Sequence, residues 1–216
     1  MNLLAHLHLG ALAELSVEEA AGNLTADFCR EKGSSAFQYG VRLHRRIDSF
    51  TDAHPQVAEA RRLFAGELRR FASVICDLAF DLCLTRTWDR WHVQRREDQG
   101  RHGQDWDGHG RENFIDRHLN SIWAIRNRLP GPSAHVLQAM IAGRWLHAYD
   151  GIGGMEASIG RIVRRRPKFA PLLKAPEPTL ERYADLELLF LKFYPDLIAE
   201  VEAWPPDLLD EGIEAE

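Results

Sequence analysis

The sequence has few cysteines and no long apolar run. Its three cysteines, Cys29, Cys76 and Cys83, are odd in number, and none stands in a Cys-x-x-Cys spacing. This argues against a disulfide framework or a structural zinc site and favours a reducing compartment. No segment approaches the roughly 20 consecutive apolar residues that a membrane-spanning helix needs. The apolar stretch 1–15 has no basic region before it and no small-residue cleavage site after it, so we expect no signal peptide and a cytoplasmic protein.

Common catalytic signatures are missing as well. The chain has no glycine-rich phosphate loop, no Gly-x-Ser-x-Gly motif and no Cys–His arrangement. The formal charge of −5 comes from the C-terminus, because residues 207–216 hold five of the 32 acidic residues and no base, which leaves 27 acids against 27 bases. A neutral body argues against bulk nucleic-acid binding, whereas local arginine clusters suit an acidic protein partner or a phosphate.

Composition and a helix-capping signal predict an all-α fold. Leu (27) and Ala (25) far outnumber Val, Ile and Thr, which total 24, and this balance favours helices over strands. Ser16 and Glu19 have the spacing of a capping box. We expect helices at 2–14, 17–30, 37–52, 56–88 with a break near 70, 112–129, 133–149, 155–166 and 179–203. They would form a single compact multi-helix domain over 1–206, interrupted by a polar, glycine-rich flexible loop at 94–113 and followed by an acidic disordered tail at 207–216.

Two aspartates lie on the apolar side of one predicted helix. In the segment 71–88 the apolar positions cover one broad arc at about 100° per residue, and Asp77 and Asp81 fall near the middle of it. Carboxylates that face a core are costly unless they are paired. A backbone amide, an arginine or a shared divalent cation would each pair them, and the segment alone leaves an ion pair and a metal site equally open.

Other polar residues repeat this pattern. His44 and Asp48 are one turn apart and share a helix face with apolar neighbours, while Asp27 follows a small and apolar stretch. His6 and His8 stand within the apolar N-terminal segment. Each alone is more often a satisfied core residue or a local salt bridge. Together they exceed what a plain helical bundle carries on its buried faces, and they favour a polar, metal-centred site. His102, Asp105, Asp107 and His109 could also be drawn as a metal site, but their glycine-rich surroundings favour a solvated loop.

Several segments, taken in order, resemble one family. MNLLAHLHL, GNLTADF, LHRRIDSFTD and DLAFDLCLTRTW, followed by RWLHAYD, RRRPKF and KFYP, are similar to the acyl carrier protein phosphodiesterases. This family is a divergent branch of the all-α HD-type metal-dependent phosphohydrolases. The resemblance implies a hydrolase that uses Mn²⁺, with Mg²⁺ as the second choice. It would cleave the phosphodiester between 4′-phosphopantetheine and a serine of holo-acyl carrier protein, in fatty acid metabolism. No nucleic acid or membrane is expected as a partner.

Residue roles follow from this resemblance. The expected metal ligands are Asp27, His44, Asp77 and Asp81, with Asp48 as a supporting residue or alternative ligand. His6 and His8 are the next choice, as ligands or proton carriers. The expected catalytic residues are Asp27, His44, Arg45, Arg46 and Asp48, where an arginine would stabilise charge on the phosphoryl group. The acidic carrier protein would bind Arg42, Arg61, Arg62, Arg69 and Arg70. A second basic cluster is Arg161, Arg164, Arg165, Arg166 and Lys168.

One departure from the family pattern keeps alternatives open. The family usually has a histidine directly after the aspartate at position 81, and another after Arg86. This chain has Leu82 and Thr87 there. The alternatives are an HD-type phosphohydrolase that acts on a nucleotide or other small phosphoester, and a non-catalytic protein that binds carrier protein.

Overall fold

The computed structural model describes residues 1–30, 32–91, 110–149 and 151–204. Within these ranges it contains helices and no strand, so the all-α prediction is confirmed. The helices are α1 (Leu3–Leu12), α2 (Val17–Thr25), α3 (Ser35–Ala53), α4 (Pro55–Arg62), α5 (Ala72–Arg86), α7 (Gly110–Ala124), α8 (Gly131–Ala142), α9 (Ile152–Arg165), α10 (Pro176–Glu181) and α11 (Tyr183–Glu202). Short 3₁₀ segments are η1 (Ala26–Phe28), η2 (Gly66–Phe71), η3 (Arg126–Arg128) and η4 (Pro167–Lys174).

The predicted helices differ from the observed ones at several ends and in one missed break. The helix expected at 179–203 is α10 and α11, which are separated at Arg182. The segment expected as one helix at 56–88 is α4, η2 and α5, so its break spans the residues from 63 to 71 rather than one point near 70. The helix expected at 133–149 ends at Ala142. Residues 110–113, expected in the polar loop, begin α7. The rest of that loop and the acidic tail lie outside the described residues, as do His102, Asp105, Asp107 and His109.

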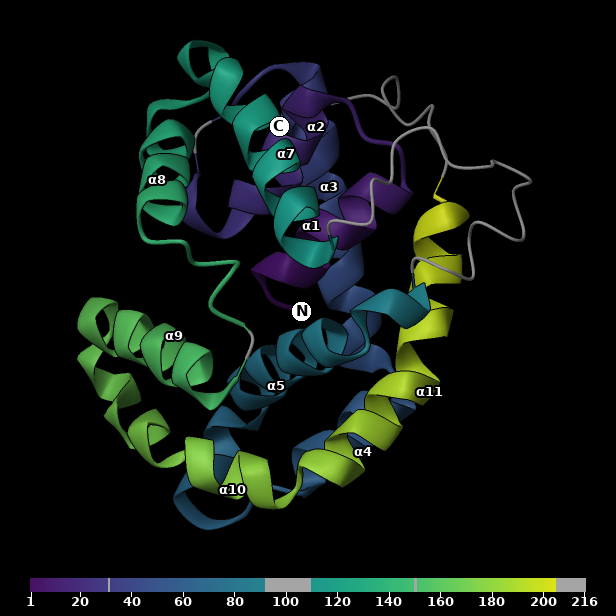
Figure 1. Ribbon diagram of the computed structural model, residues 1–216, viewed down its shortest axis with the longest axis vertical. Helices are drawn as coiled ribbons and strands as arrows, with labels where there is room; N and C mark the ends of the chain where they lie inside the picture. The colour runs from purple at the N-terminus through teal and green to yellow at the C-terminus, as the bar shows by residue number, and fades with distance from the viewer. Residues whose placement is uncertain (31, 92–109, 150, 205–216) are drawn as a thin grey trace, which may run out of the picture.

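Helix α1 lies at the centre of the molecule. Every one of its residues except Ala11 is buried, as expected of a helix that is apolar on all sides. It packs against α2, α3, α5 and α11, and Figure 1 shows α2, α3 and α7 around it, with α5, α4 and α11 on the side towards the bottom of the view. Two histidines of α1 are therefore enclosed by its neighbours. Helix α9 packs against α5 and α10, on the side of the molecule away from α2 and α7.

Two glycines let α2 and α3 approach closely. A Cβ atom on Gly40 would lie 1.8 Å from the carbonyl oxygen of Glu19, and one on Gly22 would lie 2.0 Å from that of Phe37. The N-terminus of α2 carries the predicted capping box of Ser16 and Glu19. This tight crossing places the end of α2 against the middle of α3, where the polar residues of the two helices meet.

Candidate metal centre

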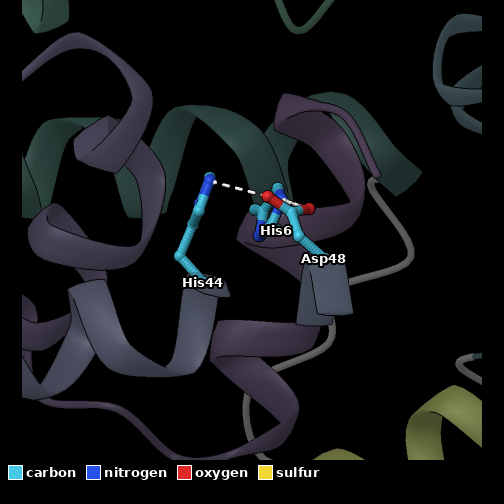
Figure 2. A group of neighbouring side chains, drawn as sticks. All are labelled: His6, His44 and Asp48. Atoms are coloured by element: carbon cyan, nitrogen blue, oxygen red, sulfur yellow. Dashed lines mark ion pairs between the residues drawn. The ribbon is translucent and has the colours of Figure 1, made fainter. Parts of the chain in front are cut away.

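Three side chains from two helices converge beside α1's first turn. His6 of α1 faces His44 and Asp48 of α3, and their candidate ligand atoms all lie within 4.8 Å of one another. The Asp48 carboxylate lies 3.3 Å from Nε2 of His6 and 3.2 Å from Nε2 of His44. Figure 2 shows both contacts as dashed lines. The two imidazole rings are stacked with their centroids 3.9 Å apart.

The ring nitrogens of this cluster suit a cation better than a hydrogen-bond network. Nδ1 of His6 is buried without a hydrogen bond among the described residues. Nε2 of each histidine faces carboxylates, Asp48 for His6 and both Asp27 and Asp48 for His44. Nδ1 of His44 lies 2.7 Å from the carbonyl oxygen of Asn23, and because a carbonyl only accepts, Nδ1 carries the proton. When the ring gives up its second proton, the Nε2 lone pair therefore points to the cluster, the orientation found in metal-binding histidines.

Charges within the cluster are strongly coupled. Burial and the neighbouring His44 lower the pKa of His6 to about 4. Burial also lowers the pKa of His44, but hydrogen bonds to Asp27 and Asp48 outweigh it and raise the value to about 9. Burial raises the pKa of Asp48, yet the hydrogen bonds from both histidines dominate and hold it well below its usual range. Without a metal, the cluster thus holds one proton on His44 between carboxylates, and a divalent cation would compete with that proton.

Asp27 connects the buried cluster to solvent. Its carboxylate lies 3.4 Å from Nε2 of His44, and its side chain is 73% exposed, against 4% for the histidine. The hydrogen bond with His44 lowers the pKa of Asp27, so it is ionised at neutral pH. Asp27 is therefore the cluster's outward-facing carboxylate, suited to a fourth ligand or to a proton acceptor.

Asp77 and Asp81 do not share one site. Asp77 lies 3.3 Å from the amino group of Met1, which also lies 3.1 Å from Asp48. Asp81 accepts the backbone N–H groups of Leu4 at 3.0 Å and Ala5 at 3.1 Å. These are first-turn donors that have no partner within helix α1. The structure thus pairs both carboxylates without an arginine, and it places Asp77 at the edge of the cluster and Asp81 under the start of α1.

The remaining predicted catalytic residues lie elsewhere on α3. Arg45 and Arg46 are exposed, and Nε of Arg46 donates to Glu200 of α11 at 2.6 Å. Leu82, which stands where the family histidine is expected, is 1% exposed in the core. The cluster itself draws its imidazoles from α1 and α3, so these donors are present although Leu82 offers none.

Two of the arginines predicted to bind a partner make contacts with neighbouring side chains. Arg61 pairs with Asp52, and Arg42 stacks on Tyr39. Arg62, Arg69 and Arg70 are exposed. Phe71 of η2 packs on Phe169 of η4 with ring centroids 5.3 Å apart. This contact brings Arg70 towards Arg166 and Lys168 of the second basic cluster.

Two residues of the site had no assigned role or only a secondary one in the sequence analysis. His6 was a second choice because a histidine in an apolar stretch is more often structural, whereas the fold stacks it on His44. Asn23 connects the elements: its side chain donates to the carbonyl of His6 at 2.7 Å, and its own carbonyl accepts from His44. His8, the other second choice, instead pairs with Tyr194 at 2.7 Å. A buried amide one turn before Asp27 was the only sequence signal for Asn23.

Comparisons with known proteins identify the family of the chain. The family model described as acyl carrier protein phosphodiesterase matches residues 1–197. A protein of that name from Pectobacterium atrosepticum is 34% identical over 202 residues, which cover 92% of this chain and 96% of the relative. Namesakes from Photorhabdus laumondii and Escherichia coli O157:H7 are 32% identical (94% of this chain, 96% of the relative) and 31% identical (93% and 97%). No solved structure matches. The chain therefore belongs to the acyl carrier protein phosphodiesterase family of hydrolases.

Proposed function

We propose that this protein hydrolyses the phosphodiester of holo-acyl carrier protein, releasing 4′-phosphopantetheine and apo-carrier protein, with Mn²⁺ at the His6–His44–Asp48 cluster. The observation that carries the proposal is the convergence of two buried imidazoles on one carboxylate, in a chain of this family. Mixed nitrogen and oxygen ligands suit Mn²⁺, and two imidazoles favour it over Mg²⁺. The assignment to the HD-type phosphohydrolases and the cytoplasmic location belong to the same proposal. No described helix is long and apolar enough to cross a membrane.

The protein's own residues have separable tasks in this reaction. When bound, the cation would supply Lewis-acid activation of the phosphodiester and of the attacking water. His6, His44 and Asp48 hold the site. The backbone carbonyl of Asn23 orients the His44 ring, and the Asn23 side chain ties α2 to the backbone of His6. Water forms the new bond to phosphorus, the bond from phosphorus to the serine oxygen breaks, and a proton passes to that oxygen. Asp27, exposed beside His44, is placed to accept the proton that the water loses.

The test is the mass of holo-carrier protein incubated with the protein and Mn²⁺. We expect a decrease by the mass of the phosphopantetheine group, which is lost with chelator and in the His44→Ala variant. His135→Ala, on an exposed face of α8, serves as the matched control and should retain activity. An unchanged mass with a folded, Mn²⁺-loaded parent would contradict the proposal. Hydrolysis of a small phosphoester without cleavage of carrier protein would favour the first alternative, and complex formation without cleavage would favour the second.

A further inference from the structure

A groove leads away from the outward-facing carboxylates of the cluster. A cavity of about 300 Å³ is lined by Asp27 and Asp77 at one end. A second, smaller cavity of about 80 Å³ is lined by Trp145 and Tyr149. Five residues line both cavities, which shows that the cavities adjoin: Asn2, Phe28, Leu78, Ile162 and Arg165. We call the two adjoining cavities together the arm groove.

The chemistry of the arm groove changes along its length. Near Asp27, two guanidinium groups face it, from Arg165 and Arg166. Arg165 lies over the ring of Phe28 at 4.8 Å, and neither arginine has a carboxylate partner among the described residues. An anion held beside the cluster would therefore meet unpaired cations. Such a volume is within the range of small-molecule sites.

The inner end of the groove is apolar with a few fixed polar groups. Arg161 stacks on Trp145 at 4.9 Å and donates to Ser158 at 2.7 Å. Asn2 donates to the hydroxyl of Tyr149 at 2.6 Å. A linear ligand that joins an anionic end to amides and an apolar terminus would match this order of contacts. The 4′-phosphopantetheine group has that sequence of a phosphate, a gem-dimethyl unit, two amides and a thiol.

Another cavity next to the cluster fits such a ligand less well. It has a volume of about 160 Å³, and its lining includes His6, Glu14 and His118. It contains a carboxylate and no arginine or lysine, so a phosphodiester would be repelled there rather than attracted.

We propose that the arm groove binds the phosphopantetheine arm of the substrate, with the phosphate between Arg165 and the cluster and the thiol end towards Trp145. This inference rests on the proposed function for the identity of the ligand. It adds the location and direction of the arm, and it names Arg165 and Ile162 as binding residues. Arg165 contacts the phosphate, and Ile162 forms part of the wall that both cavities share.

The test measures binding without catalysis. Calorimetry with 4′-phosphopantetheine and with pantetheine, in the presence of chelator, compares the parent with Arg165→Gln and Ile162→Trp. Arg165→Gln should weaken binding of phosphopantetheine about tenfold, by loss of a charge-assisted hydrogen bond, and leave pantetheine binding nearly unchanged. Ile162→Trp should weaken both ligands by about tenfold or more, because the indole fills the groove.

Two control variants lie on the same helix. Arg164 lines neither cavity and is exposed, as is Ala157, so Arg164→Gln and Ala157→Trp should bind like the parent. Melting temperatures establish that each variant is folded. No binding to the parent, or equal binding by the parent and both groove variants, would overturn the groove. If binding responds as described but holo-carrier protein is not cleaved, the groove stands and the proposed function fails. If holo-carrier protein is cleaved but both groove variants bind like the parent, the groove fails and the proposed function stands.

Discussion

At the scale of single residues, the histidines of α1 and α3 decide whether the cluster can hold a cation. His6→Ala or His44→Ala removes one of two imidazole ligands, and we expect the affinity for Mn²⁺ to fall by about 100-fold or more, beyond the 10–100-fold typical of losing a supporting residue. The measurement is a titration of free Mn²⁺ by electron paramagnetic resonance. His135→Ala should leave the affinity unchanged. Equal affinity in all four proteins would place the metal elsewhere.

Asp81 offers a test between a ligand and a helix cap. In Asp81→Asn, the amide can no longer accept from both Leu4 and Ala5, and one N–H group remains unpaired in the core. We expect a loss of about 1–3 kcal/mol in the free energy of unfolding, but a change in Mn²⁺ affinity of less than about tenfold, as for a residue outside the ligand set. Denaturant unfolding and the Mn²⁺ titration measure the two effects. A fall in affinity as large as that of His44→Ala, with stability unchanged, would make Asp81 a ligand.

The pH dependence of stability reports on His44. Its pKa is raised from 6.5 to about 9 in the folded protein, so between these values the folded state binds more protons than the unfolded state. Stability of the metal-free protein should therefore fall as the pH rises through this window, by roughly 2–3 kcal/mol. Below the unfolded pKa the contribution is fully present. Thermal melts in chelator measure the effect.

A variant without the imidazole serves as the comparison for this pH dependence. His44→Gln should show a much flatter profile of stability against pH over the same window, because a glutamine side chain at position 44 does not titrate. If the parent profile is equally flat, His44 does not carry the raised pKa.

At the scale of secondary-structure elements, the α2–α3 crossing sets the distance between Asn23 and His44. A Cβ atom on Gly40 would clash with the backbone of Glu19 at 1.8 Å, and a backbone atom cannot swing aside. Gly40→Ala should separate the helices and destabilise the protein by about 1–3 kcal/mol, with weaker Mn²⁺ binding as a consequence.

The control for this substitution is a helical glycine with open space around it. Nothing lies within 4 Å of a Cβ atom on Gly153 in α9, so Gly153→Ala should be neutral or stabilise the protein by up to about 1 kcal/mol. Denaturant unfolding of both variants measures the difference. Equal effects would mean that the two helices can move apart without cost.

At the scale of the whole molecule, we expect an acidic carrier protein to dock on a basic patch other than the one predicted from the sequence. Exposed bases gather around the Phe71–Phe169 contact: Arg70 lies over Phe71 at 4.7 Å, and Arg166 and Lys168 lie over Phe169 at 5.9 Å. Phe169 and Arg166 also line the mouth of the arm groove. A carrier protein docked on this basic patch would have its arm directed at the cluster, unlike one docked over Arg61, which is paired with Asp52.

Charge reversal tests this surface. The double variant Arg70→Glu/Arg166→Glu should slow association with acidic carrier protein by about tenfold at low salt, and the difference should shrink as salt increases. The matched control is Arg45→Glu/Arg62→Glu, which makes the same change in charge. Arg45 lies on α3, and Arg62 is the last residue of α4. Stopped-flow association rates distinguish the two surfaces. A larger effect in the control pair would restore the docking face expected from the sequence.

The sequence alone determined the class of fold and much of the inventory of polar residues. Helix-forming composition and the Ser16 capping box are local signals, so they predicted the helices to within a few residues at most ends. The pair His44 and Asp48 could also be found, because a spacing of four residues fixes a shared helix face. The family resemblance rested on short motifs that are likewise local.

Only the tertiary structure decided which of those polar residues meet. Asp77 and Asp81 have the same spacing as His44 and Asp48, yet the fold pairs Asp81 with the backbone of α1 and brings His6 to the cluster instead. Helix spacing fixes directions around one axis, whereas partners across helices depend on how the helices cross, and that depends on close contacts such as Gly40 against Glu19. The basic surface follows the same rule, since η2 and η4 are about 100 residues apart in the chain and meet only through the packing of Phe71 on Phe169.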